Sequence, residues 1–496
     1  MSHAGSEGDA AAAGLADDDL LASLGLDALI PASLAAWRPL LIEAMAFFLD
    51  RLPAHRLAAI IADQLALPAN AEAARRLVSL FANCPTLHKL GQVVARHRQL
   101  DPLLRLRLQS LESMPPSVAT DEVAAAIHDE LKGTGTSLVV ADEALAEGSV
   151  AVVVPFTYRD DGETQHGVFK VLKPGIEARL AEELDVMAGL AAFLSERGRQ
   201  LDLPAVDYGD TLNTVRSLLA TEVRLDIEQR NLAAAAAFYA AETRLLVPRL
   251  LPWCTPRMTA MERVFGRKVT DADIAAGQRQ ALAETMLSAL LAEPFWSATE
   301  SATVHADLHA GNLFLADDGR LAVLDWSLTA TLGKAQREAL VAIVLGGLSL
   351  DAAHIRQAVA RLGALPADDP TVGSAVERAL DRIVFAGRIP GFYWLLELLD
   401  DIALNAAGGF GEDLGLFRKT WLSLSGVVGD LTADLSADAP LLDLGLRRLL
   451  AELPARSLAL PASRGFSTHV SNLDLVALWG SPWLISARFW TRLWSA

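Results

Sequence analysis

One β-rich stretch inside a largely helical chain limits what these 496 residues can fold into. Three segments are short, rich in β-branched residues and bounded by turn residues: 137–140, 149–156 and 167–172. Asp160, Asp161 and Gly162 form a hairpin signal between the second and third segments. Helical periodicity covers about 19–131 before them and 175–242 after them. The pattern predicts a small β unit between helical regions, which is an α+β arrangement.

A second hairpin is predicted later in the chain, where strands over 312–315 and 321–324 flank a turn at 316–319. Further segments follow from the same pattern: strands over 245–251 and 257–264, a helix over 271–291, and helices to about 465. The chain is therefore expected to have five parts: a flexible leader 1–18, an N-terminal helical extension 19–132, a small lobe 133–265, a helical lobe 266–465 and a tail 466–496. A cleft between two lobes is where ligands usually bind.

Composition narrows the function classes. Apolar residues make up 52% of the chain and charged residues 21%, so the chain can bury a sizeable core. A net charge of −18 argues against non-specific binding to nucleic acid or anionic lipid. Cys84 and Cys254 lie far apart and outside any CxxC pattern, which predicts free thiols in a reducing compartment. With no run of 18 apolar residues and no secretory pattern at the N-terminus, the expected location is cytoplasmic.

The residues that carry chemistry cluster around the second hairpin. Asp307 and Asn312 stand five apart in the segment His-Ala-Asp-Leu-His-Ala-Gly-Asn, and Asp325 follows the next strand. Phosphoryl transfer needs one carboxylate to orient the nucleophile and two oxygen donors for magnesium. The spacing matches the kinase pattern HxDxxxxN followed by an Asp-led triplet, which here reads Asp-Trp-Ser.

Two other interpretations of this segment exist. It can be a polar loop between two core strands. It can also be a metallohydrolase site, because His305, Asp307 and His309 alternate and could bind one zinc or iron ion. The second interpretation leaves Asn312 and Asp325 without roles.

An upstream lysine fits the phosphoryl-transfer interpretation. Lys170 lies in the apolar strand Gly-Val-Phe-Lys-Val-Leu, from which it is expected to point into a cleft and meet phosphate. The alternative is an edge-strand lysine that discourages aggregation. Glu222 and Glu228 are candidate partners for Lys170; they are about 600° apart around a helix, so only one can serve if that helix is continuous. We assign the role to Glu222.

Together with these residues, several motifs between about 80 and 350 resemble the UbiB/AarF-like atypical kinases. Lys89-Leu90-Gly91-Gln92 resembles that family's KxGQ signature, and Lys170 to Gly175 resembles its lysine strand with a basic-Pro-Gly turn. The other segments that resemble family motifs are Glu147–Ala151 (nucleotide loop), Glu222–Asn231 (ExD helix), and Met261-Glu262 with Gly266 (hinge). The resemblance implies a bilobal protein-kinase-like fold with an N-terminal helical extension that carries KxGQ.

The resemblance also implies ATP and Mg²⁺ as cofactors and gives each site residue a role. Asp307 would be the base or orienter of the nucleophile, and Asn312 and Asp325 would hold magnesium. The nucleotide-binding residues implied in the same way are Lys170, Ser149, Glu262, Lys89 and Gln92. The KxGQ helices would cover the site and favour ATPase or small-molecule activity over protein substrates. Many family members support ubiquinone or other isoprenoid lipid pathways, so a quinone or isoprenoid precursor is the implied partner.

Some positions depart from the family pattern. The ExD position reads Glu222-Val223-Arg224, with a cation in place of the second acid. Glu147 brings a negative charge that would repel phosphates if it faced them. Trp326 and Ser327 replace the Phe and Gly of the usual triplet. A Trp at this position is also seen in the aminoglycoside/choline kinase-like phosphotransferases, which have a similar His-x-Asp loop and are the nearest alternative family. A nucleotide-binding regulator without turnover is the alternative class.

The tail is rich in tryptophan. Trp479, Trp483, Trp490 and Trp494 fall in the last 24 residues, and thirteen uncharged residues separate Asp474 from Arg488. This stretch is too short to span a bilayer. One interpretation is peripheral attachment to the inner membrane, with tryptophans at the interface and Arg488 and Arg492 at the headgroups. The other is docking on the helical lobe or on a partner.

Overall fold

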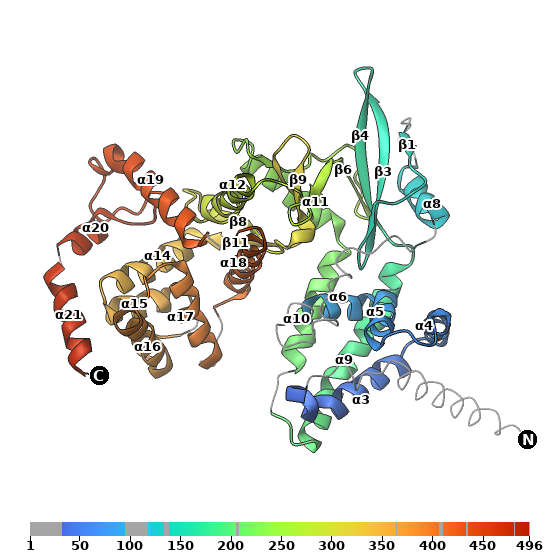
Figure 1. Ribbon diagram of the computed structural model, residues 1–496, viewed down its shortest axis with the longest axis horizontal. Coiled ribbons are helices and arrows are strands. Elements are labelled where there is room, and N and C mark those ends of the chain that lie inside the picture. Colours follow the sequence, from blue (N-terminus) through green and yellow to red (C-terminus); the bar gives the residue numbers. More distant parts are fainter. Residues whose placement is uncertain are drawn as a thin grey trace, which may run out of the picture. The chain divides into compact units, whose positions relative to one another are not determined.

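A computed structural model describes residues 32–94, 118, 120–132, 138–204, 208–363, 365–405, 410–432, 435–480 and 482–495 (Figure 1). The predicted leader lies outside these residues. The chain divides into two compact units: the first comprises Met1–Arg230 and Arg249–Arg263, and the second Asn231–Pro248 and Val264–Ala496. The last division, after Arg263, lies two residues from the expected lobe boundary at 265/266.

The first unit contains a five-stranded antiparallel sheet. Its strands are β1 (Leu138–Val140), β2 (Ala146–Glu147), β3 (Ala151–Asp160), β4 (Glu163–Leu172) and β6 (Met258–Glu262), in the order β1-β3-β4-β6 with β2 beside β3. The β3–β4 hairpin turns at Asp161 and Gly162, which have φ values of 45° and 83°. Positive φ at both central residues matches the right-handed twist of a tight hairpin, so the predicted turn is confirmed.

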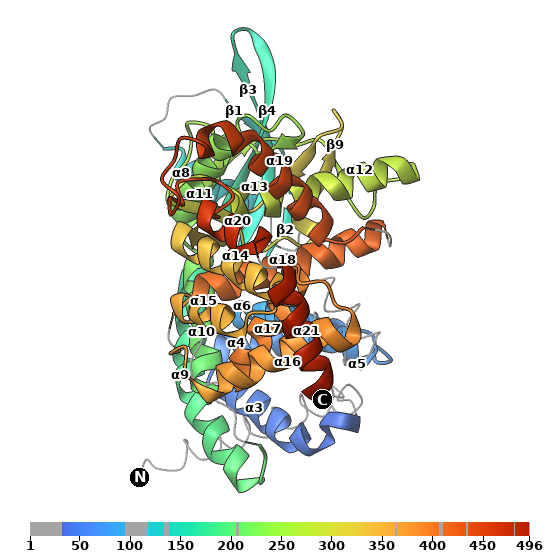
Figure 2. The ribbon, with the colours of Figure 1, turned by 90° about the vertical axis from the view of Figure 1, so that its left-hand side faces the viewer.

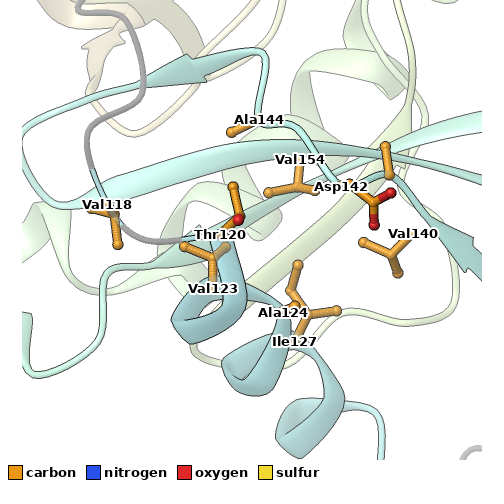
Figure 3. Close-up of a pocket in the computed structure, with 10 residues that line it drawn as sticks. Val118, Thr120, Val123, Ala124, Ile127, Val140, Asp142, Ala144 and Val154 are labelled. Atoms are coloured by element: carbon orange, nitrogen blue, oxygen red, sulfur yellow. The ribbon is translucent and has the colours of Figure 1, made fainter.

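Aromatic rings form the core of this sheet. Phe156 and Phe169 stack with centroids 4.0 Å apart, and a Cβ at Gly167 would lie 2.3 Å from the Phe156 ring. Helix α8 (Thr120–Glu130) packs on the sheet through buried Val123 and Ile127. Figure 3 shows the hollow between α8 and the strands, which has a volume of about 20 Å³ and is lined mostly by apolar side chains. It has room for about one water molecule, so it is a packing gap rather than a ligand site.

In chain order, helices both precede and follow the first strands of that sheet. Those of the first unit are η1 (Ala32–Trp37), α3 (Arg38–Asp50), α4 (Ala54–Ala66), α5 (Ala73–Asn83), α6 (Pro85–Val94), α9 (Ile176–Gln200) and α10 (Tyr208–Glu222), and α11 (Leu225–Phe238) begins in it. A buried Arg56 joins α4 to Glu183 of α9 with a 2.6 Å ion pair, and Thr86 of α6 donates to the same carboxylate. The helical stretch expected over 175–242 consists of the three helices α9, α10 and α11.

The second unit has two small sheets. One has the order β5-β10-β9-β7, from β5 (Leu245–Leu246), β10 (Leu321–Val323), β9 (Leu313–Ala316) and β7 (Gly266–Lys268). The other pairs β8 (Ser301–His305) with β11 (Thr329–Gly333). The predicted hairpin is β9–β10. The strand expected over 245–251 is only two residues long, and because it pairs with β10 it belongs to the second unit rather than to the small lobe.

The rest of the second unit is helical (Figures 1 and 2). Its elements are α12 (Ala276–Leu287), a π-helical turn (Ser288–Ala292), α13 (Glu293–Phe295), α14 (Lys334–Leu348), α15 (Ala352–Arg361), α16 (Pro370–Ala386), α17 (Phe392–Asn405), α18 (Glu412–Leu431), α19 (Asp438–Arg456), α20 (Asn472–Trp479) and α21 (Pro482–Ser495). Among the helices that the structure describes, none is both long and apolar enough to cross a membrane.

The two tail arginines bind carboxylates of their own unit. Arg488 donates to Asp351 at 2.7 Å, and Arg492 pairs with Asp381 and Glu377. These ion pairs hold α21 against α15 and α16, as the docking interpretation expects. The tryptophans Trp479, Trp483, Trp490 and Trp494 remain exposed. Membrane contact stays a prediction, and it now depends on the tryptophans rather than on the arginines.

Candidate active site

The predicted site residues fall into two groups, one in each unit. The lysine group is Lys170, Glu228, Lys89, Glu222 and Ser149, in the first unit. The loop group is His305, Asp307, Asn312 and Asp325, in the second.

Lys170 is held by Glu228. Lys170 lies in the middle of β4, opposite Val153 of β3 and Thr259 of β6. Its Nζ donates to Glu228 Oε1 at 2.9 Å, and the Glu228 side chain is only 2% exposed. A lysine on a central strand with a buried carboxylate partner has a fixed ammonium position, so the edge-strand interpretation is wrong.

The assignment of Glu222 as the partner of Lys170 is also wrong. The chain leaves the helix at Val223 and Arg224, between α10 and α11, so Glu222 ends one helix and Glu228 lies in the first turn of the next. Arg224, the cation in the ExD-like position, turns to Asp226, with Nε 2.8 Å from Oδ1. The departure from the family pattern therefore leaves the Lys170–Glu228 pair intact.

Glu222 instead connects the N-terminal helices to the loop before β3. Lys89 of α6 forms an ion pair with Glu222 Oε1, and Ser149 Oγ donates to Glu222 Oε2 at 3.1 Å. Gln92 lies in the same helix as Lys89, but its side chain is outside the described residues. The lysine and the serine that were predicted to bind nucleotide thus share one carboxylate.

Glu147 does not present an unpaired charge to a phosphate site. Its side chain is 3% exposed, pairs with Lys173 at 2.6 Å and accepts a hydrogen bond from the Val118 amide. Burial lowers the pKa of Lys173. Glu262, at the end of β6, pairs with Arg249 at 2.8 Å in the segment predicted to be the hinge.

His305 organises the loop group. It is 1% exposed at the end of β8, and its ring packs edge-on against Trp326 with centroids 4.7 Å apart. Nε2 donates to Leu324 O at 3.1 Å, and Nδ1 accepts from the Asp307 amide at 3.1 Å. Burial lowers the pKa of His305, which favours this neutral form. Both ring nitrogens are engaged, so the metallohydrolase interpretation loses a ligand.

Asp307 and Asn312 are tied together through the backbone. Asn312 Nδ2 donates to Asp307 O at 3.0 Å, so a cation would be held by the amide oxygen Oδ1. The Asp307 carboxylate accepts from Lys419 Nζ at 2.9 Å, and His309 Nε2 lies 3.7 Å from Asp307 Oδ2. An amide oxygen beside a positioned carboxylate suits magnesium and a hydroxyl nucleophile.

Asp325 has a backbone conformation that few aspartates adopt. Its φ is 55°, in the left-handed region, and Oδ1 accepts from the Ser327 amide at 3.3 Å. Trp326 is buried, its Nε1 donates to Val323 O at 3.2 Å, and Asn231 Nδ2 donates to Trp326 O. These hydrogen bonds hold the Asp-Trp-Ser triplet, and with it the Asp325 carboxylate, in one conformation. Residues with a strained backbone of this kind concentrate at functional sites.

One family model matches a stretch of chain that contains the loop group and, except for Lys89, the lysine group. The ABC1 atypical kinase-like domain matches residues 110–359, half of the chain, and the match includes Lys170, Glu228, Asp307 and Asp325. The chain belongs to this family. Its fold is accordingly α+β and protein-kinase-like, which confirms the predicted fold class and sets aside the aminoglycoside/choline kinase-like family.

Several curated proteins resemble this ABC1-family chain. One is an uncharacterised, chloroplastic aarF domain-containing protein kinase of Arabidopsis thaliana, 26% identical over 66% of this chain and 59% of that protein. Another is an uncharacterised protein of Mycobacterium tuberculosis, 29% identical over 61% of this chain and 62% of that protein. A probable protein kinase UbiB of Shewanella is 29% identical over 47% of this chain and 42% of that protein. The chain thus spans about two fifths to three fifths of each relative's length.

Two solved structures are also similar. One is a Mycobacterium tuberculosis protein in complex with erythromycin, at 18% identity and a TM-score of 0.46, covering 64% of this chain and 80% of that one. The other is an aminoglycoside phosphotransferase with AMP-PNP and hygromycin B, at 12% identity and a TM-score of 0.23, covering 57% of this chain and 100% of that one.

One residue that contacts the loop group of this ABC1-family protein was missed by the sequence reasoning. Lys419 lies in α18, more than 100 residues after Asp307, and no motif surrounds it. Its only sequence signal is rarity, since the chain has seven lysines among 43 basic residues. Lys419 joins Lys89, Lys170 and Lys173 as a lysine paired with a carboxylate.

Proposed function

We propose that this ABC1-family chain binds ATP with Mg²⁺ and transfers the terminal phosphoryl group to an acceptor or to water. The observation that carries the proposal is the loop group, in which His305 and Asn312 hold the Asp307 backbone while Asp325 adopts its left-handed conformation beside a locked Trp326. This arrangement supports the proposal because phosphoryl transfer needs one carboxylate to orient the nucleophile and two oxygen donors for a cation.

Each side chain has a role in the proposal. The Lys170 ammonium, oriented by Glu228, would bind phosphate oxygens. Asn312 Oδ1 and the Asp325 carboxylate would hold magnesium, which suits hard oxygen ligands. The Asp307 carboxylate would accept a hydrogen bond from the attacking hydroxyl or water and hold it in line. ATP would supply the phosphoryl group, and magnesium would neutralise its charge.

The N-terminal helices fit an ATPase or a small-molecule kinase. Lys89 of α6 reaches Glu222, and through it the Ser149 loop next to β3. The resemblance noted above implies that such helices cover the site and restrict protein substrates. We propose that the acceptor is water or an isoprenoid or quinone precursor, a class supported by the resemblance and by the UbiB-named relatives.

A nucleotide-binding and turnover assay tests the proposal. Wild type should bind ATP more tightly with magnesium than without it. It should form ADP, together with free phosphate when water is the acceptor, and the rate of ADP formation should rise if an isoprenoid phenol in liposomes is the acceptor. Asp325→Asn should lose the magnesium dependence of binding. Magnesium-dependent binding with no turnover under any of these conditions would favour the regulator class instead.

The tail supports a second proposal, contact with a lipid surface. The exposed side chains of α20 and α21 include no charged residue among those the structure describes in these helices, and Trp479 and Trp494 are each 81% exposed. Tryptophan prefers the membrane interface. Vesicles of neutral lipid should bind wild type and release a variant with Trp479, Trp483, Trp490 and Trp494 changed to Ser. Equal flotation of both proteins would remove this proposal.

A further inference from the structure

Helix α18 contacts the segment His305–Leu308 at three points, through residues that belong to no motif. Lys419 Nζ donates to Asp307 Oδ1 at 2.9 Å. Thr420 Oγ1 donates to His305 O at 2.9 Å, and Ser423 Oγ donates to Leu308 O at 2.7 Å. Residue 423 follows 419 by four positions and 420 by three, so its side chain lies between theirs on the helix surface, and the three residues span an arc of about 100°. One helix face therefore binds the backbone on both sides of Asp307 as well as its carboxylate.

The helix that makes these contacts is firmly anchored. Phe417, Trp421 and Leu424 are buried in the core of the second unit, with exposed fractions of 1%, 1% and 0%. Asp413, in the first turn of α18, accepts a hydrogen bond from the Thr331 amide of β11 at 2.8 Å. Close-packed apolar side chains allow little movement, so α18 is held in place. Its hydrogen bonds therefore hold the segment around Asp307 in place as well.

The charge arrangement at Asp307 is asymmetric. The Lys419 ammonium engages Oδ1, whereas Oδ2 faces the His309 ring at 3.7 Å, beyond hydrogen-bond distance. The exposed fractions of the Lys419 and Asp307 side chains are 37% and 17%, so solvent screens this pair only in part. The adjacent Arg418 points elsewhere and pairs with Asp400. Lys419 is thus the α18 cation that sets the orientation of the Asp307 carboxylate.

We propose that Lys419 is a positioning residue for Asp307, and that the α18 face with Lys419, Thr420 and Ser423 holds the loop that carries Asp307. This inference rests on the proposed function. A carboxylate free to rotate would present the wrong oxygen to the nucleophile for part of the time. Misplacement of a reacting group by about 1 Å can cost on the order of a hundredfold in rate. Lys419 acts through Asp307, so its loss affects turnover rather than nucleotide affinity.

The test compares three variants of the full chain. Lys419→Met should lower kcat for magnesium-dependent ATP turnover by about tenfold to a hundredfold while KM for ATP stays within about twofold. Lys419→Arg keeps the cation and should recover most of kcat. Arg418→Met removes the neighbouring cation of the same helix and should retain the wild-type kcat. Hydrogen exchange of the peptide over 304–312 should rise in Lys419→Met relative to Arg418→Met, with unchanged melting temperatures.

The outcomes separate this inference from the proposed function. If wild type turns over ATP and Lys419→Met matches it, the inference is overturned while the proposed function stands. A higher kcat in Lys419→Met would identify the pair as a brake and would also overturn it. Equal loss of kcat in Lys419→Met and Arg418→Met would show a general effect on α18 and would count against a positioning role. A wild type without magnesium-dependent turnover overturns the proposed function and the inference that rests on it.

Discussion

Glu228 holds the ammonium of Lys170 at 2.9 Å, while Glu222, six residues earlier, pairs with Lys89. The two carboxylates serve different lysines because the chain breaks between α10 and α11 at Val223 and Arg224. Lys170 is therefore oriented by α11. The N-terminal helix α6 is linked to the end of α10 through Lys89 and Glu222.

Because Glu228 and Glu222 pair with different lysines, matched substitutions at the two positions should have different effects. Glu228→Gln leaves the Lys170 ammonium without its buried charge partner, so turnover should fall about a hundredfold. Glu222→Gln keeps the Lys170–Glu228 pair, so turnover should change less, while the link from Lys89 weakens and α6 becomes more sensitive to limited proteolysis. Steady-state ATP turnover and proteolysis measure the two effects. A larger turnover loss in Glu222→Gln than in Glu228→Gln would restore Glu222 as the partner that matters for Lys170.

A buried ion pair should dominate the stability of the N-terminal helices. Arg56 is 7% exposed and Glu183 is fully buried, and Thr86 adds two hydrogen bonds to the same carboxylate. Arg56→Met leaves Glu183 without its cation, which should lower the free energy of unfolding by about 3–5 kcal/mol. Arg51→Met, at an exposed pair with Asp50, should change it by less than about 1 kcal/mol. Urea unfolding checks both values, and similar midpoints for the two variants would refute the prediction.

Stability should also depend on pH through His469. Burial lowers the pKa of His469 from 6.5 to about 4, and its Nε2 donates to Phe295 O at 2.8 Å. Below pH 6.5 the unfolded chain binds a proton at this residue that the folded chain does not. Its contribution, about 3 kcal/mol, is therefore complete above pH 6.5 and is lost as pH falls toward 4.

The His469→Asn variant isolates this contribution. Asparagine tolerates the left-handed backbone at position 469, where φ is 61°. Urea midpoints of wild type should fall more steeply between pH 7.5 and pH 5 than those of His469→Asn. Parallel pH profiles for the two proteins would show that His469 does not carry the effect.

The elements that sequence reasoning predicted have local signals. The turn at Asp161 and Gly162 and the hairpin β9–β10 are set by neighbouring residues, and Asp307, Asn312 and Asp325 lie within one short segment. Strands β8 and β11 were missed because they are short and pair with residues more than 20 positions away. The break after Glu222 carries no glycine or proline, and the Lys419 contact depends on how α18 packs, so neither could be read from the chain.

The central claim is that Asp307 positions the nucleophile for phosphoryl transfer. The most direct measurement is magnesium-dependent ATP turnover by wild type and Asp307→Asn, with nucleotide binding measured in parallel. Asparagine keeps the size of the side chain, so binding should stay within about twofold while turnover falls by a factor of about a hundred or more. Equal turnover by wild type and Asp307→Asn would contradict the account.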